Sequence, residues 1–167
     1  SIDIWNICGK SCMGLLCDDT EKRMWKIVIC DDNEEFLHYI KDMLYAYLSE
    51  RNIKCEICTY EDSRYIIGLD FSTTHIYLLD IDMPQLDGFS IASVVRNKTP
   101  DSLIIFISNR EERVYESLKY RPIRFIRKEH VTEELAEALD VSFRELEHRR
   151  KLVTLPTTDG VKMIALA

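Results

Sequence analysis

Three apolar runs of this chain each end in charged residues. Asp31 and Asp32 follow the first run, Asp80 follows the second and Lys128 follows the third. If the runs are neighbouring parallel strands, their carboxyl ends open into one crevice, which is where α/β sheets bind ligands. Three carboxylates beside one ammonium repel one another unless a divalent cation binds among them. The pattern therefore predicts a site for magnesium and phosphate.

The spacing of apolar residues predicts strands and helices that alternate along the chain. Asn33 is expected to cap the first helix, and Thr132 is expected to open the last. Five β-α units favour an α/β fold with a doubly wound, five-stranded parallel sheet of order 2-1-3-4-5. Strands are expected at 25–30, 53–59, 76–80, 102–107 and 123–127, and helices at 33–50, 62–69, 89–97, 111–119 and from 132 onward.

Four segments in this order resemble the receiver domain of two-component response regulators. They are Asp31-Asp32, residues 79–88 (Leu-Asp-Ile-Asp-Met-Pro-Gln-Leu-Asp-Gly), Ser108 and Lys128. The resemblance covers roughly residues 24–150 and implies a single flavodoxin-like receiver domain there. It also implies that the domain is no enzyme beyond its own phosphoryl transfer and dephosphorylation, and that its partner is a sensor histidine kinase.

The resemblance implies a role for each matched residue. Asp80 is the expected phosphoacceptor, a carboxylate nucleophile that forms an aspartyl phosphate. Mg²⁺ is the expected cofactor, and its expected ligands are Asp31, Asp32, Asp80 and the backbone at Asp82. Lys128 is expected to bind a phosphoryl oxygen as a point charge, and the Ser108 hydroxyl is expected to donate to another. Phe125 holds the position of the switch aromatic, which turns when Ser108 moves toward the phosphoryl group.

The mouth of the expected site departs from the family pattern. Glu129 follows Lys128 where the family has proline, and Asn109 replaces a small residue after the hydroxyl position. Asp82 adds a fourth carboxylate two residues after the phosphoacceptor, and Arg110 lies two residues after Ser108. We expect Asp82 and Arg110 to meet as an ion pair across the entrance.

The segment around 120–128 resembles receivers that precede LytTR-type DNA-binding domains. On this basis residues 151–167 are expected to be a linker and the first strands of such an output domain, and residues 1–23 a leader or cloning extension. Between residues 110 and 128 there are seven basic and three acidic residues. This stretch covers the fourth helix and fifth strand, so the face made with the fifth helix is a candidate surface for a partner or a homodimer.

Composition restricts the classes of function. The net charge of −7 argues against nucleic-acid binding by these residues, because contacts with phosphates need clustered Lys and Arg. DNA binding is therefore expected only through a C-terminal output domain beyond this sequence. No run approaches the roughly 18 apolar residues of a membrane span. We expect a cytoplasmic protein with no membrane partner.

Two alternatives compete with this interpretation. A haloacid-dehalogenase-type phosphatase also has a strand-end Asp-x-Asp, here Asp80 and Asp82, followed by a hydroxyl and a lysine. That family places its further acidic motif after the lysine, whereas Asp31 and Asp32 precede every other motif here. The second alternative is a receiver-like interaction module that is not phosphorylated in vivo.

Overall fold

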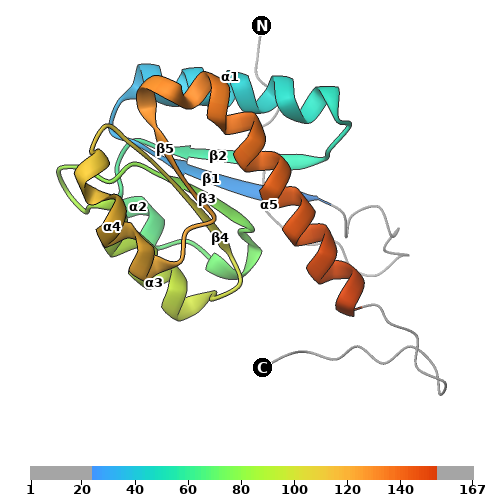
Figure 1. The fold of residues 1–167 in the computed structure, drawn as a ribbon. Helices are drawn as coiled ribbons and strands as arrows, with labels where there is room; N and C mark the ends of the chain where they lie inside the picture. The colour runs from blue at the N-terminus through green and yellow to red at the C-terminus, as the bar shows by residue number, and fades with distance from the viewer. Residues whose placement is uncertain (1–23, 154–167) are drawn as a thin grey trace, which may run out of the picture.

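The computed structural model describes residues 24–153, which form a five-stranded parallel sheet with helices on both faces (Figure 1). The strand order is β2-β1-β3-β4-β5, as the sequence predicts. In register, Cys30 of β1 lies beside Leu79 of β3, and Ser108 of β4 beside Arg127 of β5. The strands are β1 (Trp25–Cys30), β2 (Cys55–Tyr60), β3 (Ile76–Leu79), β4 (Leu103–Ser108) and β5 (Arg124–Arg127).

Two apolar layers hold the helices on the sheet. Successive side chains of a strand point to opposite faces, so Ile27 and Ile29 join one layer while Val28 and Cys30 join the other. The first layer packs beneath α1 and α5, and the second packs beneath α2 and α3. The helices are α1 (Glu34–Glu50), α2 (Arg64–Ile67), α3 (Gly88–Lys98), α4 (Val114–Ser117) and α5 (Val131–Val153).

Side-chain caps fix where two of these helices begin. The Asn33 side chain accepts a hydrogen bond from the Phe36 N–H (2.9 Å), which confirms the predicted cap of α1. Asp87 caps α3 by accepting from the Ser90 N–H (2.7 Å). Both helices therefore begin close to the carboxyl edge of the sheet, where the predicted site lies.

The prediction of one continuous helix at 111–119 is wrong. Only α4 is α-helical, and 3-10 turns flank it at Glu111–Arg113 and Leu118–Tyr120. The segment ends at Arg121 in the left-handed region (φ 50°). The Arg96 guanidinium of α3 donates to the carbonyls of Tyr120 (2.5 Å) and Arg121 (3.0 Å). These bonds fix the end of the segment and compensate carbonyls that a longer helix would have satisfied.

The last helix begins before its predicted first residue and runs past the expected end of the domain. A 3-10 turn at Lys128–His130 leads directly into α5, which begins at Val131, one residue before Thr132. The helix continues to Val153, three residues past the expected domain boundary, because no glycine or proline interrupts this stretch. Residues 152 and 153, expected to belong to the linker and output-domain segment, are therefore the end of α5. The expected leader at 1–23 and the remainder of the C-terminal segment, 154–167, lie outside the described residues.

Candidate functional site

The ends of three strands bring the predicted charges together. The Lys128 ammonium lies 2.5 Å from Asp31 Oδ2 and 3.0 Å from Asp80 Oδ2. Asp31 follows β1, Asp80 follows β3 and Lys128 follows β5, and all three strands run in the same direction. The crevice inferred from the sequence is thus formed by residues that are 48 or more positions apart from Lys128 in the chain.

The two consecutive aspartates have different environments. The Asp31 side chain is only 3% exposed, and its Oδ1 accepts a hydrogen bond from the Asn33 N–H (2.9 Å). Asp32 is exposed and lines the open pocket beside the site. Burial raises the pKa of Asp31 above its usual value, although the Lys128 ammonium opposes this shift. Asp31 is therefore the internal partner of Lys128, and Asp32 is the carboxylate that faces solvent.

Lys128 keeps its position although no proline follows it. Burial lowers the pKa of its ammonium, but hydrogen bonds and charges from Asp31 and Asp80 outweigh burial and raise the pKa above the ordinary value. The ammonium also lies 4.7 Å from the centre of the Phe36 ring, at cation-π distance. The site predicted from the sequence does not include Phe36. Its contact with Lys128 depends on the packing of α1 beside α5, where the Tyr39 and Thr132 hydroxyls lie 2.8 Å apart, so no local sequence signal indicates it.

The backbone around Asp80 fixes one of its two carboxylate oxygens. Oδ1 accepts hydrogen bonds from the N–H groups of Ile81 (2.7 Å) and Asp82 (3.4 Å), while Oδ2 faces Lys128. Gly88 makes this loop compact. A Cβ there would lie 2.1 Å from the Asp80 carbonyl oxygen, so α3 can start against the acceptor loop only because residue 88 has no side chain.

The acidic cluster fits a hard divalent cation. Asp31, Asp32 and Asp80 each offer a carboxylate oxygen within 4.8 Å of the others. With Lys128 included, the four side chains carry a net charge of −2. Asp31 Oδ2 is buried and has the Lys128 ammonium as its partner at 2.5 Å. Oxygen-only ligands with excess negative charge suit Mg²⁺ better than a softer metal.

The hydroxyl and aromatic positions lie beneath the site. Ser108 is fully buried, and its Oγ accepts a hydrogen bond from the Arg110 N–H (3.2 Å). Phe125 is half-buried and pairs in register with Phe106 of β4. The open pocket is lined by Asp32, Asn33, Asp80, Asp82, Asn109, Arg110 and Lys128. Ser108 and Phe125 are thus close to the site in the fold but are not among the residues that line this pocket.

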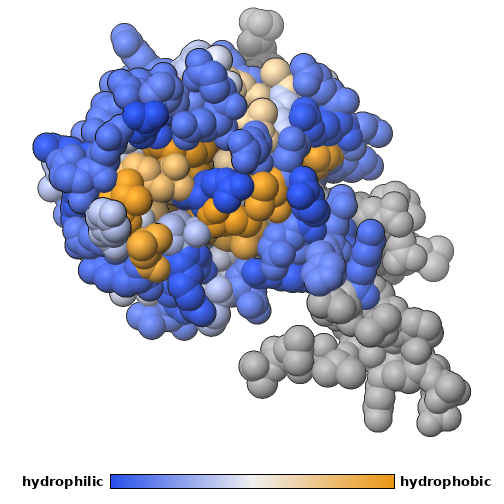
Figure 2. Space-filling view, viewed as in Figure 1, coloured by the Kyte–Doolittle hydropathy of each residue, from blue (hydrophilic) through white to orange (hydrophobic). Residues whose placement is uncertain are grey.

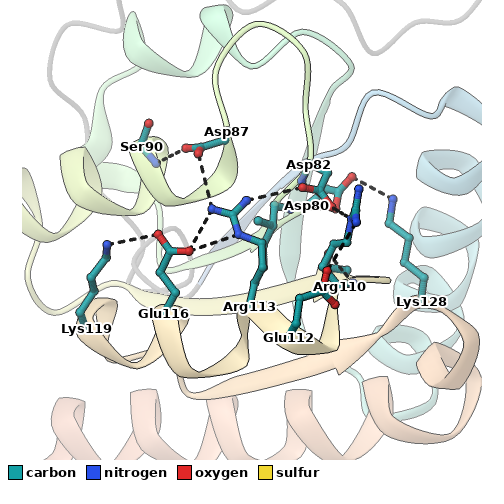
Figure 3. Close-up of polar contacts among 12 residues, drawn as sticks. Asp80, Asp82, Asp87, Ser90, Arg110, Glu112, Arg113, Glu116, Lys119 and Lys128 are labelled. Atoms are coloured by element: carbon teal, nitrogen blue, oxygen red, sulfur yellow. Dashed lines mark hydrogen bonds and ion pairs between the residues drawn. The ribbon is translucent and has the colours of Figure 1, made fainter.

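An ion pair crosses the mouth of the pocket (Figure 3). Arg110 Nε lies 3.0 Å from Asp82 Oδ2, which confirms the predicted contact. A second guanidinium, that of Arg113, reaches the other oxygen of the same carboxylate (3.5 Å). Sequence reasoning missed Arg113. The only available signal was its position three residues after Arg110, which places two arginines on the same side of a helical turn.

Comparison with known proteins identifies the family of the domain. Residues 27–140 match the response regulator receiver domain. The chain belongs to this family. A receiver domain is the phosphorylation-based regulatory switch of a two-component response regulator, it interacts with sensor histidine kinases, and it binds Mg²⁺ at an acidic pocket. The family assignment removes the haloacid-dehalogenase alternative.

Solved receivers share the fold. A receiver domain protein from Clostridium thermocellum is 22% identical, with a TM-score of 0.60 over 77% of this chain and 98% of that one. The response regulator TrrA from Thermotoga maritima, solved in complex with Mg²⁺-BeF, is 25% identical, with a TM-score of 0.57 over 71% of this chain and 99% of that one.

A curated relative shows the domain within a longer protein. The protein-glutamate methylesterase/protein-glutamine glutaminase 3 of Geobacter sulfurreducens is 28% identical over 131 residues. The match covers 77% of this chain but only 33% of that relative. The chain therefore spans about a third of the length of this relative.

Among the described residues, no helix is long and apolar enough to cross a membrane.

Proposed function

We propose that this receiver accepts a phosphoryl group on Asp80 from a sensor histidine kinase, with Mg²⁺ as cofactor. The observation that carries the proposal is the environment of the Asp80 carboxylate. Its side chain is only 5% exposed, its Oδ1 is held by backbone N–H groups, and its Oδ2 lies 3.0 Å from an ammonium. A buried carboxylate that is oriented at one oxygen and charge-compensated at the other is well placed to act as a nucleophile.

The transfer needs one bond to form and one to break. A carboxylate oxygen of Asp80 forms the bond to phosphorus while the bond from phosphorus to a phosphohistidine nitrogen breaks, and the electron pair leaves with the imidazole. Lys128 is placed to hold a phosphoryl oxygen once it exchanges part of its contact with Asp80. Asp31, Asp32, Asp80 and the backbone at Asp82 would hold Mg²⁺. When bound, the metal supplies the positive charge that lets an anionic phosphoryl group approach these carboxylates.

We propose that Ser108 and Phe125 couple phosphorylation to a conformational change. The Ser108 Oγ accepts from the Arg110 N–H, and the hydroxyl can donate its own proton toward an added phosphoryl oxygen. Movement of Ser108 would open space near the end of β4, into which the half-buried Phe125 ring on β5 can turn. The phosphoryl group would then bias a two-state equilibrium in the face made by α4, β5 and α5.

We propose that this face carries the signal to a second copy and to a C-terminal DNA-binding domain of the LytTR type. Figure 2 shows hydrophobic side chains gathered between α4 and α5. Tyr115 is 86% exposed and Leu118 is 59% exposed, so both offer apolar surface for a partner to cover. The face is less basic than its residue count suggests, because Arg124 pairs with Glu137 and Arg127 with Glu111.

The decisive experiment is incubation of the chain with Mg²⁺ and a small acyl phosphate, followed by intact mass measurement. We expect one added phosphoryl group that is lost in mild acid or base and is absent without Mg²⁺. Asp80→Asn should abolish the adduct, since an amide is not a competent nucleophile, while the fold is retained. An unmodified wild-type chain would favour the alternative of an interaction module that is not phosphorylated. A stable adduct on another residue would refute the role of Asp80.

A further inference from the structure

One arginine joins the loop after the phosphoacceptor to α3 and α4 (Figure 3). The Arg113 guanidinium lies 3.5 Å from Asp82, two residues after Asp80, and 4.0 Å from Asp87, which caps α3. The same group lies 3.1 Å from Glu116 within α4. A planar guanidinium with several N–H donors can hold three carboxylates at once, which a lysine ammonium cannot do with the same geometry.

The Arg113 guanidinium packs against the apolar core instead of extending into solvent. The Arg113 guanidinium carbon lies 4.4 Å from the centre of the Phe89 ring, and the Arg113 side chain is 26% exposed, against 59% for Arg110. Phe89 is buried and packs edge-on against Phe106 of β4, with ring centres 5.1 Å apart. Because the Phe89 ring is held in the core, the Arg113 guanidinium has a defined resting position. A shift of the guanidinium away from that position can move the residues that it contacts.

The Asp82 carboxylate that Arg113 contacts also forms the ion pair with Arg110 at the mouth of the site. Arg110 binds Asp82 Oδ2 (3.0 Å), and Arg113 approaches Oδ1 (3.5 Å). The backbone N–H of Arg110 also donates to Ser108 Oγ. Negative charge added on Asp80 would repel the Asp82 carboxylate and attract both guanidinium groups. The relative attraction of the Arg113 guanidinium to Asp82 and to Glu116 must then change.

The element that receives this change is weakly constrained. α4 has only four α-helical residues, Val114–Ser117, between two 3-10 turns. Such a short helix has little cooperative stability of its own, so the side-chain contacts at its ends decide its position. Arg113 provides the contact at its first end.

We propose that Arg113 is a positioning residue that couples the charge on Asp80 to α4, in addition to the route through Ser108 and Phe125. The inference rests on the proposed function, because it needs an anionic group to bind at Asp80. In the resting domain Arg113 holds Asp82, Asp87 and Glu116 together. With a phosphoryl group in place, Arg113 shifts toward the mouth of the site and loosens Glu116, and α4 moves with it.

The test compares binding at the site with the response of α4. Wild type, Arg113→Met and the milder Arg113→Lys are titrated with beryllofluoride, a phosphoryl mimic, in the presence of MgCl₂. Hydrogen exchange is then followed across residues 111–120, and calorimetry gives the affinity for the mimic. Arg124→Met is the matched control, since Arg124 pairs with Glu137 on the same face but contacts none of the three carboxylates around Arg113. Melting temperatures establish that each variant is folded.

We expect every variant to bind the mimic with affinities within about threefold of one another, and wild type and Arg124→Met to change exchange across 111–120 by at least about fivefold. In Arg113→Met and Arg113→Lys this change should fall below about twofold. An undiminished response in both Arg113 variants would overturn the inference, as would a loss of response that parallels a loss of binding. Binding to wild type with no response across 111–120 refutes the coupling but leaves the proposed function standing. Failure of wild type to bind refutes the proposed function itself.

Discussion

Replacing Lys128 by methionine tests the charge arrangement on which the site depends. The substitution keeps an unbranched side chain and removes the ammonium that meets Asp31 and Asp80 and lies over the Phe36 ring. The two carboxylate side chains are only 3% and 5% exposed, so neither can recover full hydration in the folded state. The variant therefore keeps two buried negative charges without their compensating positive charge.

The magnitude follows from the burial of the three groups. Breaking a buried ion pair by removal of one partner costs about 3–5 kcal/mol of unfolding free energy. The Lys128 side chain is 17% exposed, so water has some access and the lower end of the range, about 3 kcal/mol, applies. For a domain of this size that loss lowers the melting temperature by about 10 °C.

The loss should depend on pH in a defined direction. Burial already raises the folded-state pKa of Asp31, and removal of Lys128 takes away the charge and hydrogen bond that oppose this shift most, while the Asn33 N–H remains. A folded-state pKa above the unfolded value means that the folded state binds the proton more tightly, so acidification favours folding. The loss of unfolding free energy in Lys128→Met should be largest near pH 7. It should shrink as the pH falls through the raised folded-state pKa of Asp31 and approach its minimum near the ordinary Asp pKa of about 4.

Thermal and urea unfolding of both proteins at several pH values, without metal and with MgCl₂, would measure this effect. Mg²⁺ should restore much of the lost stability, because it supplies positive charge to the same carboxylates. Lys119→Met is the control: Lys119 is exposed and pairs with Glu116, so its melting temperature should stay within about 1 °C of wild type. If Lys128→Met were as stable as wild type at pH 7 without metal, the three charges would not interact as the structure indicates.

Three further predictions concern the same edge of the sheet. Asp32→Ala should abolish stabilisation by Mg²⁺ while raising the metal-free melting temperature slightly, because an exposed like charge is removed; unchanged metal affinity in titration calorimetry would contradict this. Asp82→Ala and Arg110→Ala should each speed dephosphorylation of Asp80, and the double variant should be no faster than either; strict additivity of the rates would show that the pair does not gate the site jointly. Gly88→Ala should lower the unfolding free energy by about 2 kcal/mol in urea titrations, whereas Gly68→Ala, whose added Cβ would lie 3.8 Å from the Tyr65 carbonyl oxygen, should change it little; equal effects would refute the close approach at Gly88.

Much of the fold could be predicted from the sequence because its signals are local. Strand segments of four to six residues end at Cys30, Leu79 and Arg127, with helical patterns between them, and the parallel arrangement follows from that alternation. The fourth helix could not be predicted correctly. Its local pattern resembles one helix, but hydrogen bonds from Arg96, on a different element, determine where the chain turns at Arg121.

The sequence by itself determined which charges gather: Asp31, Asp80 and Lys128 end parallel strands, and the direction of those strands brings their ends to one edge. Only the tertiary structure decided how these charges divide their roles. Asp31, not Asp32, is buried against Lys128, and Phe36 supports the ammonium from a neighbouring helix. Likewise, Arg113 meets Asp82 only because β4 lies beside β3. Local patterns along the chain specify the alternation of strands and helices, whereas burial and partner choice depend on contacts between distant segments, which local patterns do not specify.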